Sequence, residues 1–180
     1  RTVPAGELSR FRKFLSGNAD EYNIEPLNPQ TVKYATAVLD KNIEHYRVVI
    51  NKNKSDEKMY VGAVGAEIGY SQFHFGAGEA STIEKIDRIE NAPDNALVLI
   101  EEIENGLHPV AVRMMVHYLQ SAAKRKRLQI VFTTHSQDAV NELPDKSVWA
   151  AINKRTWNGK LSIESLRAIT GETPDARAIY

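Results

Sequence analysis

Two neighbouring acids, Glu101 and Glu102, directly follow an uninterrupted apolar run, Ala96 to Ile100. Such a run is typical of a strand covered on both faces of a mostly parallel sheet, and these sheets bind ligands at the carboxyl ends of their strands. Two carboxylates held this close repel each other unless a cation or a proton is shared between them. The pair therefore predicts a divalent metal site; the alternative is that both acids are solvated residues at the start of a loop.

A histidine, His135, directly follows a second predicted apolar strand, Leu128 to Thr134. An imidazole at a strand tip hydrogen-bonds a phosphoryl oxygen, or reports its presence by moving. The alternative is a histidine that is satisfied at a strand end, and for a lone histidine that reading would be favoured. His135 is not alone, because it follows the acid pair by about 33 residues.

A glycine-containing segment, Phe75 to Ser81 (FGAGEAS), stands at the start of a predicted helix. Glycines directly before a helix N-terminus let backbone N–H groups approach an anion closely, and the helix dipole adds favourable partial charge. Gly76 and Gly78 therefore suit a bound phosphate, with a plain turn and helix cap as the alternative.

The elements that position these residues alternate between helix and strand from about residue 80. This is the pattern of an α/β domain with a mostly parallel sheet flanked by helices. The hydrophobic spacing predicts helices and strands in turn, followed by a hairpin turn. The helices are expected over 81–90 and 109–124, the strands over 96–100, 128–134 and 147–152, and the turn at 157–160.

The first part of the chain predicts a smaller helical and β region. Helices are expected over 7–16 and 28–40, and strands over 46–51 and 59–64 that a polar loop joins, with 67–75 as a possible extension of the sheet. We place the domain boundaries at 1–58, 59–170 and 171–180, the last being the start of a possible downstream domain.

The order of the three chemical features resembles that of ABC-type ATPases, which carry a signature segment, a Walker B strand and a switch histidine. In a Walker B strand the first acid holds Mg²⁺, usually through water, and the second polarises the water that attacks the γ-phosphate of ATP. The residues IEEIENGLHPVAV and FTTHS are similar to the OLD (overcoming lysogenization defect) family, in the ABC-like branch that includes SMC-like repair proteins. The resemblance covers about residues 60–170 and is specific over 73–136.

The resemblance implies a role for each matched position. Glu101 is the Mg²⁺-side acid, Glu102 is the catalytic base, and His135 is the switch histidine. Asn105 opens the D-loop that crosses the dimer interface, and it is counted with the nucleotide-binding residues. The signature segment, which touches the γ-phosphate of a nucleotide held by a second subunit, comprises Phe75, Gly76, Ala77, Gly78 and Glu79.

Three departures from the family pattern bear on these roles. Gly76 replaces the signature Ser, which removes a hydroxyl donor to the phosphate. Glu101 stands where most relatives have Asp, and its extra methylene moves the carboxylate outward. The phosphate-binding loop G-x-x-x-x-G-K-[ST] does not occur in the 180 residues, since Gly62 to Gly69 lacks the Lys that should follow.

The missing phosphate loop has two explanations. It lies upstream in polypeptide outside this chain, as the start at Arg1 suggests, or the chain is a degenerate half that partners a complete one. We favour the first because Glu102 and His135 are retained. In OLD-type proteins a TOPRIM nuclease domain follows the ATPase, and residues 178–180 resemble the opening of its first strand. Nuclease activity is thus an implication about a segment outside this chain.

Composition and charge exclude several classes of protein. Lys and Arg number 23, as do Asp and Glu, so no net charge draws the chain toward nucleic acid or membranes. Cysteine is absent, which removes disulfides, thiolate catalysis and cysteine-ligated metals. No apolar run approaches the roughly 20 residues that span a bilayer, so we expect a cytoplasmic protein without a membrane partner. The basic run 124–127 is interpreted as a solvated helix end, with DNA phosphate contact as the alternative.

Together these features predict the C-terminal half of an ABC-like ATPase that uses ATP and Mg²⁺. It hydrolyses ATP at the interface of a homodimer or higher oligomer and controls action on DNA, in anti-phage defence or DNA repair. The alternative is a non-catalytic, ATP-sensing scaffold that recruits a partner effector protein. A metal-dependent hydrolase that uses Glu101, Glu102 and Glu104 without ATP is a weaker third hypothesis, since no histidine ligands lie nearby in the sequence.

Overall fold

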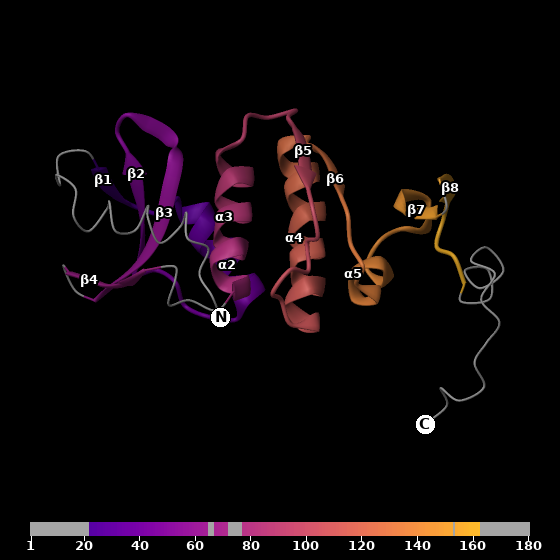
Figure 1. Ribbon diagram of the computed structural model, residues 1–180, viewed down its shortest axis with the longest axis horizontal. Coiled ribbons are helices and arrows are strands. Elements are labelled where there is room, and N and C mark those ends of the chain that lie inside the picture. The colour runs from indigo at the N-terminus through magenta and orange to yellow at the C-terminus, as the bar shows by residue number, and fades with distance from the viewer. Residues whose placement is uncertain (1–21, 65–66, 72–76, 153, 163–180) are drawn as a thin grey trace, which may run out of the picture.

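The computed structural model describes residues 22–64, 67–71, 77–152 and 154–162. The helix expected over 7–16, the positions Phe75 and Gly76, and the segment 163–180 lie outside the described residues. The fold is α/β, as the sequence predicts. A sheet lies at one end, helices α2, α3 and α4 lie in the middle, and the hairpin of β7 and β8 lies toward the other end (Figure 1). Among the described residues, the helices include none with the length and apolar character to span a membrane.

Four antiparallel strands form the largest sheet, in the order β1-β2-β3-β4. The predicted hairpin is confirmed in β2 (Tyr46–Asn51) and β3 (Lys54–Val64), although β3 begins earlier than expected. β4 (Glu67–Ser71) extends the sheet, as the sequence allowed. Strand β1 (Tyr22–Pro26) is not predictable from the sequence, because four of its five residues are exposed and carry no apolar alternation.

Helices α2 (Pro29–Leu39) and α4 (Pro109–Lys126) begin with the same device. The Asn28 side chain accepts the Gln30 N–H at 2.9 Å, and a proline follows at the first helical position. His108 plays the capping role for α4, with its Nδ1 accepting the Val110 N–H at 3.4 Å. The inner face predicted for α4 is confirmed by the burial of Val112, Met115, Val116 and Leu119.

Helix α3 (Ala77–Asn91) begins four residues before the predicted start at 81. Gly78 and Glu79 therefore belong to its first turn and do not precede it. The helix buries the isoleucines whose spacing predicted it, Ile83, Ile86 and Ile89.

A buried carboxylate fixes α3 against α2 and β3. Asp87, 2% exposed, accepts hydrogen bonds from the Thr31 hydroxyl at 3.2 Å and the Tyr60 hydroxyl at 3.1 Å. Lys58 Nζ lies 3.1 Å from the same carboxylate, and the Asn91 amide donates at 2.9 Å. Burial raises the pKa of Tyr60, and the negative charge of Asp87 raises it further. α3 is thus held by a fully hydrogen-bonded polar cluster in addition to its apolar face.

Two residues of the basic run hold the other end of α3. Arg125 pairs with the buried Glu90 at 2.7 Å. Lys126, 8% exposed, donates to the backbone oxygens of Ile89, Glu90 and Ala92 at 2.9, 2.7 and 2.6 Å. The basic run does lie at the end of α4, but it is not wholly solvated as expected. Lys126 is buried, and it caps the C-terminal end of α3 and not that of its own helix. Its charge is directed into the protein and not toward DNA phosphates.

Strands β5 (Leu97–Ile100) and β6 (Gln129–Phe132) pair in parallel across the α4 crossover. Side chains alternate between the faces of this pair. One face packs against the core through Val98, Ile100, Ile130 and Phe132. The other face is exposed: Leu97 is 60%, Leu99 72% and Val131 60% accessible.

Two expectations about the sheet need correction within the described residues. Parallel pairing is confined to β5 and β6, while the larger sheet is antiparallel, so the sheet content is not mostly parallel. The run 96–100 is covered on one face and not on both. A continuous apolar run shows that both faces can be buried, but it does not show which neighbouring element covers each of them.

The C-terminal part contains α5 (Gln137–Asn141), a short 3-10 helix (Asp145–Ser147) and the hairpin of β7 (Trp149–Ile152) and β8 (Arg155–Asn158). The predicted strand at 147–152 is confirmed, but the turn expected at 157–160 is wrong. Ile152 pairs with Arg155, so the chain reverses earlier. Gly159, with φ of 103°, instead donates its N–H to the Val148 oxygen at 2.8 Å and closes the far end of the hairpin.

Candidate functional site

The carboxyl ends of the parallel strands β5 and β6 bring the acid pair and the histidine to the same end of this strand pair. The Thr133 N–H donates to the Ile100 oxygen at 3.0 Å, and the Ile103 N–H donates to the Thr133 oxygen at 3.2 Å, so the two loops continue the strand pairing. His135 Nε2 lies 4.0 Å from Glu102 Oε1. These side chains are 84% and 55% exposed, so both remain open to a ligand.

Glu102 has an unusual backbone conformation. Its φ of 47° lies in the left-handed region, which costs a residue with a side chain about 1–2 kcal/mol. The Thr133 hydroxyl accepts the Glu102 N–H at 3.0 Å and holds the residue in this conformation. Such strain persists only where the surroundings fix it, and it is concentrated at functional sites. The turn sets the Glu102 carboxylate toward His135.

A third acid, Glu104, joins the loop after β5 to the loop after β6. One of its oxygens accepts the His135 N–H at 2.5 Å, and the other accepts the Thr134 hydroxyl at 2.7 Å. Partial burial acts to raise the pKa of Glu104, but the hydrogen bonds from His135 and Thr134 outweigh it, so the pKa falls below its usual 4.5. The backbone of the histidine loop is thus bound to a carboxylate in the loop that follows the neighbouring strand.

The start of α3 touches the loop that follows the acid pair. A Cβ added to Gly78 would lie 2.0 Å from the Gly106 oxygen and 3.1 Å from Leu107 Cδ2, so only glycine fits there. Asn105 is exposed on the same loop, and its N–H donates to the Glu102 oxygen at 3.0 Å. The two segments that the sequence assigned to nucleotide binding are therefore in direct contact, and Gly78 serves this close approach.

Glu79, also predicted to bind nucleotide, has protein partners. Its carboxylate pairs with Lys41 Nζ at 2.8 Å and accepts a short hydrogen bond from the Tyr46 hydroxyl. The side chain is 14% exposed. These contacts tie the first turn of α3 to the segment between α2 and β2.

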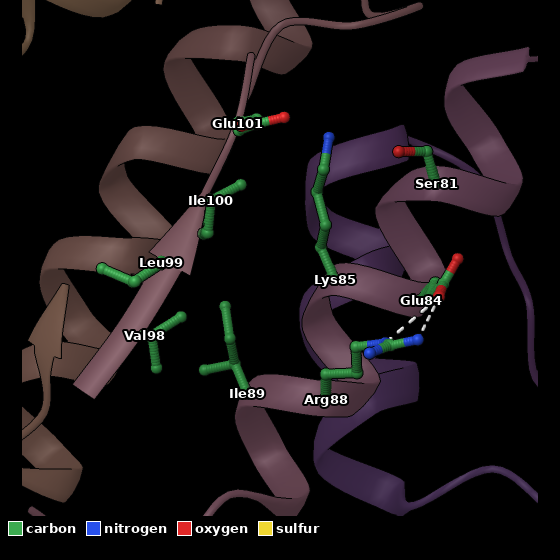
Figure 2. A pocket seen from close by; sticks show the side chains of 9 residues that line it. All are labelled: Ser81, Glu84, Lys85, Arg88, Ile89, Val98, Leu99, Ile100 and Glu101. Carbon is green, nitrogen blue, oxygen red and sulfur yellow. Dashed lines mark hydrogen bonds and ion pairs between the residues drawn. The ribbon is translucent and has the colours of Figure 1, made fainter. Parts of the chain in front are cut away.

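A cleft of about 300 Å³ lies between α3 and β5, and Glu101 stands at one end of it (Figure 2). The Lys85 side chain extends from α3 toward that end of β5, while Arg88 is engaged with Glu84 at 2.7 Å. Partial burial lowers the pKa of the Lys85 ammonium, an effect that the carboxylates of Glu104 and Glu84 oppose. A cation therefore lies beside the acid-bearing end of the strand.

The donor types at the strand end suit Mg²⁺, which prefers oxygen ligands and keeps several waters. Glu101 and Glu102 are exposed carboxylates on adjacent residues, as a water-mediated site needs. Within the described ranges, no three acids or histidines converge as a self-contained metal site. Both Glu104 oxygens accept hydrogen bonds from the His135 loop, so the described residues give no support to the ATP-independent hydrolase built on Glu101, Glu102 and Glu104.

Sequence reasoning missed three contributors to this site: Thr133, Lys85 and the loop-joining role of Glu104. A threonine at the end of a strand carries no signal of its own, and the partners of Thr133 and Glu104 lie 31 and 30 residues away. Lys85 lies on α3, whose apolar isoleucine spacing predicted only the buried face of the helix. Only the fold places its charge near the acids.

Comparison with known families decides what kind of domain this is. Residues 7–140 match the family described as the AAA ATPase domain, which is most of the chain. The chain belongs to the AAA ATPase domain family. An ATPase-type, nucleotide-binding function accompanies that membership, and the elements that carry the candidate site, α3, β5, α4 and β6, lie within the matched residues. No curated protein matches the chain significantly.

Solved structures of SMC ATPases are among those similar to this AAA ATPase domain. One comes from work on ATP-driven dimerisation and DNA-stimulated activation of SMC ATPases, with 13% identity, TM-score 0.48, and coverage of 79% of this chain and 87% of that one. A second is an SMC head bound to the C-terminal winged-helix domain of ScpA, with 16% identity, TM-score 0.47, and coverage of 78% and 44%. A third is the Pyrococcus furiosus Smc head with an extended coiled coil and the C-terminal domain of ScpA, with 14% identity, TM-score 0.45, and coverage of 79% and 36%. The chain thus spans less than half of the second and third structures.

Proposed function

We propose that this AAA ATPase domain hydrolyses ATP between two copies of the chain, with Glu102 as the catalytic base. The observation that carries the proposal is the 4.0 Å approach of His135 Nε2 to Glu102 Oε1 at the joined ends of two parallel strands. A base and an imidazole in one exposed position can bind a water and a phosphoryl oxygen at the same time.

Each residue of the edge has a role in this proposal. Glu102 accepts a proton from the attacking water, and His135 donates a hydrogen bond to the γ-phosphate. Glu101 would hold Mg²⁺ through water, and the ion would supply positive charge to offset that of the phosphates. The Glu101 and Glu102 side chains are exposed, which supports these roles because both must reach a nucleotide that approaches from the solvent side.

The nucleotide needs groups from elsewhere to hold its phosphates. The phosphate-binding loop G-x-x-x-x-G-K-[ST] does not occur in the 180 residues, so we propose that it comes from polypeptide outside this chain. The start of α3, with Ala77 as its first residue, presents the signature segment to the nucleotide of a second copy. Gly78 is in direct contact with Gly106, so the signature segment lies against the loop that follows Glu102. This contact supports the proposal that both segments face the same nucleotide.

The finer assignments come from the sequence resemblance and remain proposals. We propose membership in the OLD branch, DNA as the partner whose processing ATP controls, and a role in defence or repair. A linked TOPRIM nuclease and a partner effector belong to the same proposal. DNA stimulation of turnover that weakens steeply with salt would support the DNA assignment, since phosphate contacts release counterions.

The substitution Glu102→Gln tests the proposed function. In the polypeptide that carries both this domain and its phosphate loop, we expect ATP turnover to fall about 100-fold or more while ATP binding is retained, because the amide cannot accept the proton. His135→Ala should lower turnover by about 100-fold.

Two outcomes would decide against hydrolysis by this site. Normal turnover in Glu102→Gln would remove the base assignment. Nucleotide binding without turnover in the unmodified protein, with a partner recruited only in the ATP-bound form, would favour the non-catalytic scaffold instead.

A further inference from the structure

Glu104 is absent from the proposed chemistry, yet both of its carboxylate oxygens make short contacts at the site. Its two carboxylate oxygens accept the His135 N–H at 2.5 Å and the Thr134 hydroxyl at 2.7 Å. Thr134 Oγ1 in turn accepts the Ser136 N–H at 3.0 Å. One side chain from the β5 loop thus engages three consecutive residues of the β6 loop, directly or through one hydroxyl.

These contacts fix the backbone of His135 and not its ring. The imidazole is exposed, and its Nε2 lies 4.0 Å from Glu102 Oε1. The position of the ring relative to Glu102 therefore depends on where the backbone of the β6 loop is held. A displacement of about 1 Å at a reacting group can cost about 100-fold in rate, so this attachment bears directly on the reaction.

The geometry points to Glu104 as a positioning residue that acts through His135, an inference that rests on the proposed function of His135. Hydrogen bonds to a charged acceptor are stronger than neutral ones, which suits a carboxylate that must hold a strand-end loop exposed to solvent. Each of the two Glu104 oxygens accepts a hydrogen bond from the β6 loop, so the side chain is engaged in holding that loop.

Comparing two amide substitutions separates this role from catalysis. A glutamine at 104 can keep both contacts, because its amide oxygen accepts the His135 N–H and its amide nitrogen donates to the Thr134 hydroxyl. We expect Glu104→Gln to retain most of the ATP turnover, whereas Glu102→Gln loses it. Glu104→Ala removes both contacts, and turnover should fall about 10- to 100-fold with little change in the KM for ATP.

Two further readouts identify the route through His135. Amide hydrogen exchange of His135 should accelerate about 10-fold or more in Glu104→Ala and stay slow in Glu104→Gln and in the surface control Glu84→Ala. In the double variant Glu104→Ala/His135→Ala, turnover should be no lower than in His135→Ala alone, because coupled residues are not additive. Circular dichroism and thermal unfolding would check that each variant is folded.

Three results would overturn the inference. They are unchanged exchange of His135 in Glu104→Ala, a Glu104→Gln variant as impaired as Glu104→Ala, and full additivity in the double variant. Normal turnover in His135→Ala would instead remove the proposed function of the histidine. The exchange measurement would still judge whether Glu104 holds the loop, so the two failures are distinguishable.

Discussion

The backbone of Glu102 is strained at the residue where we propose that chemistry occurs. Its φ is 47°, and the Thr133 hydroxyl accepts its N–H. Relief of this strain by glycine is available at no steric cost. A glutamate at this strained position therefore points to a functional role for its carboxylate that offsets the loss of stability.

We predict that Glu102→Gly raises the free energy of unfolding by about 1 kcal/mol, because glycine adopts positive φ without the steric cost. The matched control is Glu101→Gly, since Glu101 is not among the described residues with positive φ; there glycine should lower stability by about 0.5–1 kcal/mol. Urea unfolding of the two variants gives the comparison. Equal losses in both would show that the Glu102 backbone is not strained.

At this scale the sequence could name the acids and the histidine but not what holds them. Glu101, Glu102 and His135 were predictable because each directly follows or ends an apolar strand. The support from Thr133 and Glu104 depends on contacts across 31 and 30 residues, which only the strand pairing creates. The protein partners of Glu79 were likewise invisible, because Lys41 lies 38 residues away.

Helix α3 borders the proposed site in two places: its first turn contacts the loop of Gly106, and its side chains line the cleft beside β5. Its first turn touches the Gly106 oxygen, Asp87 bonds it to β3, and Lys126 donates to the carbonyl oxygens at its C-terminal end. Replacing a residue in this contact should therefore disturb the loop after the acid pair.

We predict that Gly78→Ala lowers the free energy of unfolding by about 1–3 kcal/mol through overpacking. The sign is informative, because alanine in a helix normally gains about 0.5–1 kcal/mol over glycine. Ser81→Ala, on the same helix, should change stability by less than about 0.5 kcal/mol. A stabilised Gly78→Ala variant in urea unfolding would contradict the close contact between α3 and the Gly106 loop.

Elements with a local signal were predicted well, and those without one were not. The start of α2 follows from Asn28 and Pro29, and the inner faces of α3 and α4 follow from apolar spacing. The edge strand β1 has mostly exposed residues and no such spacing. The Asn158-Gly159 pair misled the hairpin prediction, because turn-forming residues also terminate strands.

In the whole molecule, the proposed site is built from the loops that follow the parallel strands β5 and β6. Glu102 and His135 are exposed, and the facing surface of β5 and β6 presents Leu97, Leu99 and Val131 to solvent. A site this open needs further groups around the nucleotide before water is excluded from it. We propose that a second copy of the chain and the phosphate loop provide these groups.

The most direct test of that account is the molar mass of the Glu102→Gln variant, in the polypeptide with its phosphate loop, by light scattering. With ATP and Mg²⁺ we predict a stable dimer, because ATP that cannot be hydrolysed keeps the two copies joined by mass action. Removal of Mg²⁺ by a chelator, or replacement of ATP by ADP, should return the monomer. A monomeric mass at saturating ATP and Mg²⁺ would contradict hydrolysis between two copies of the chain.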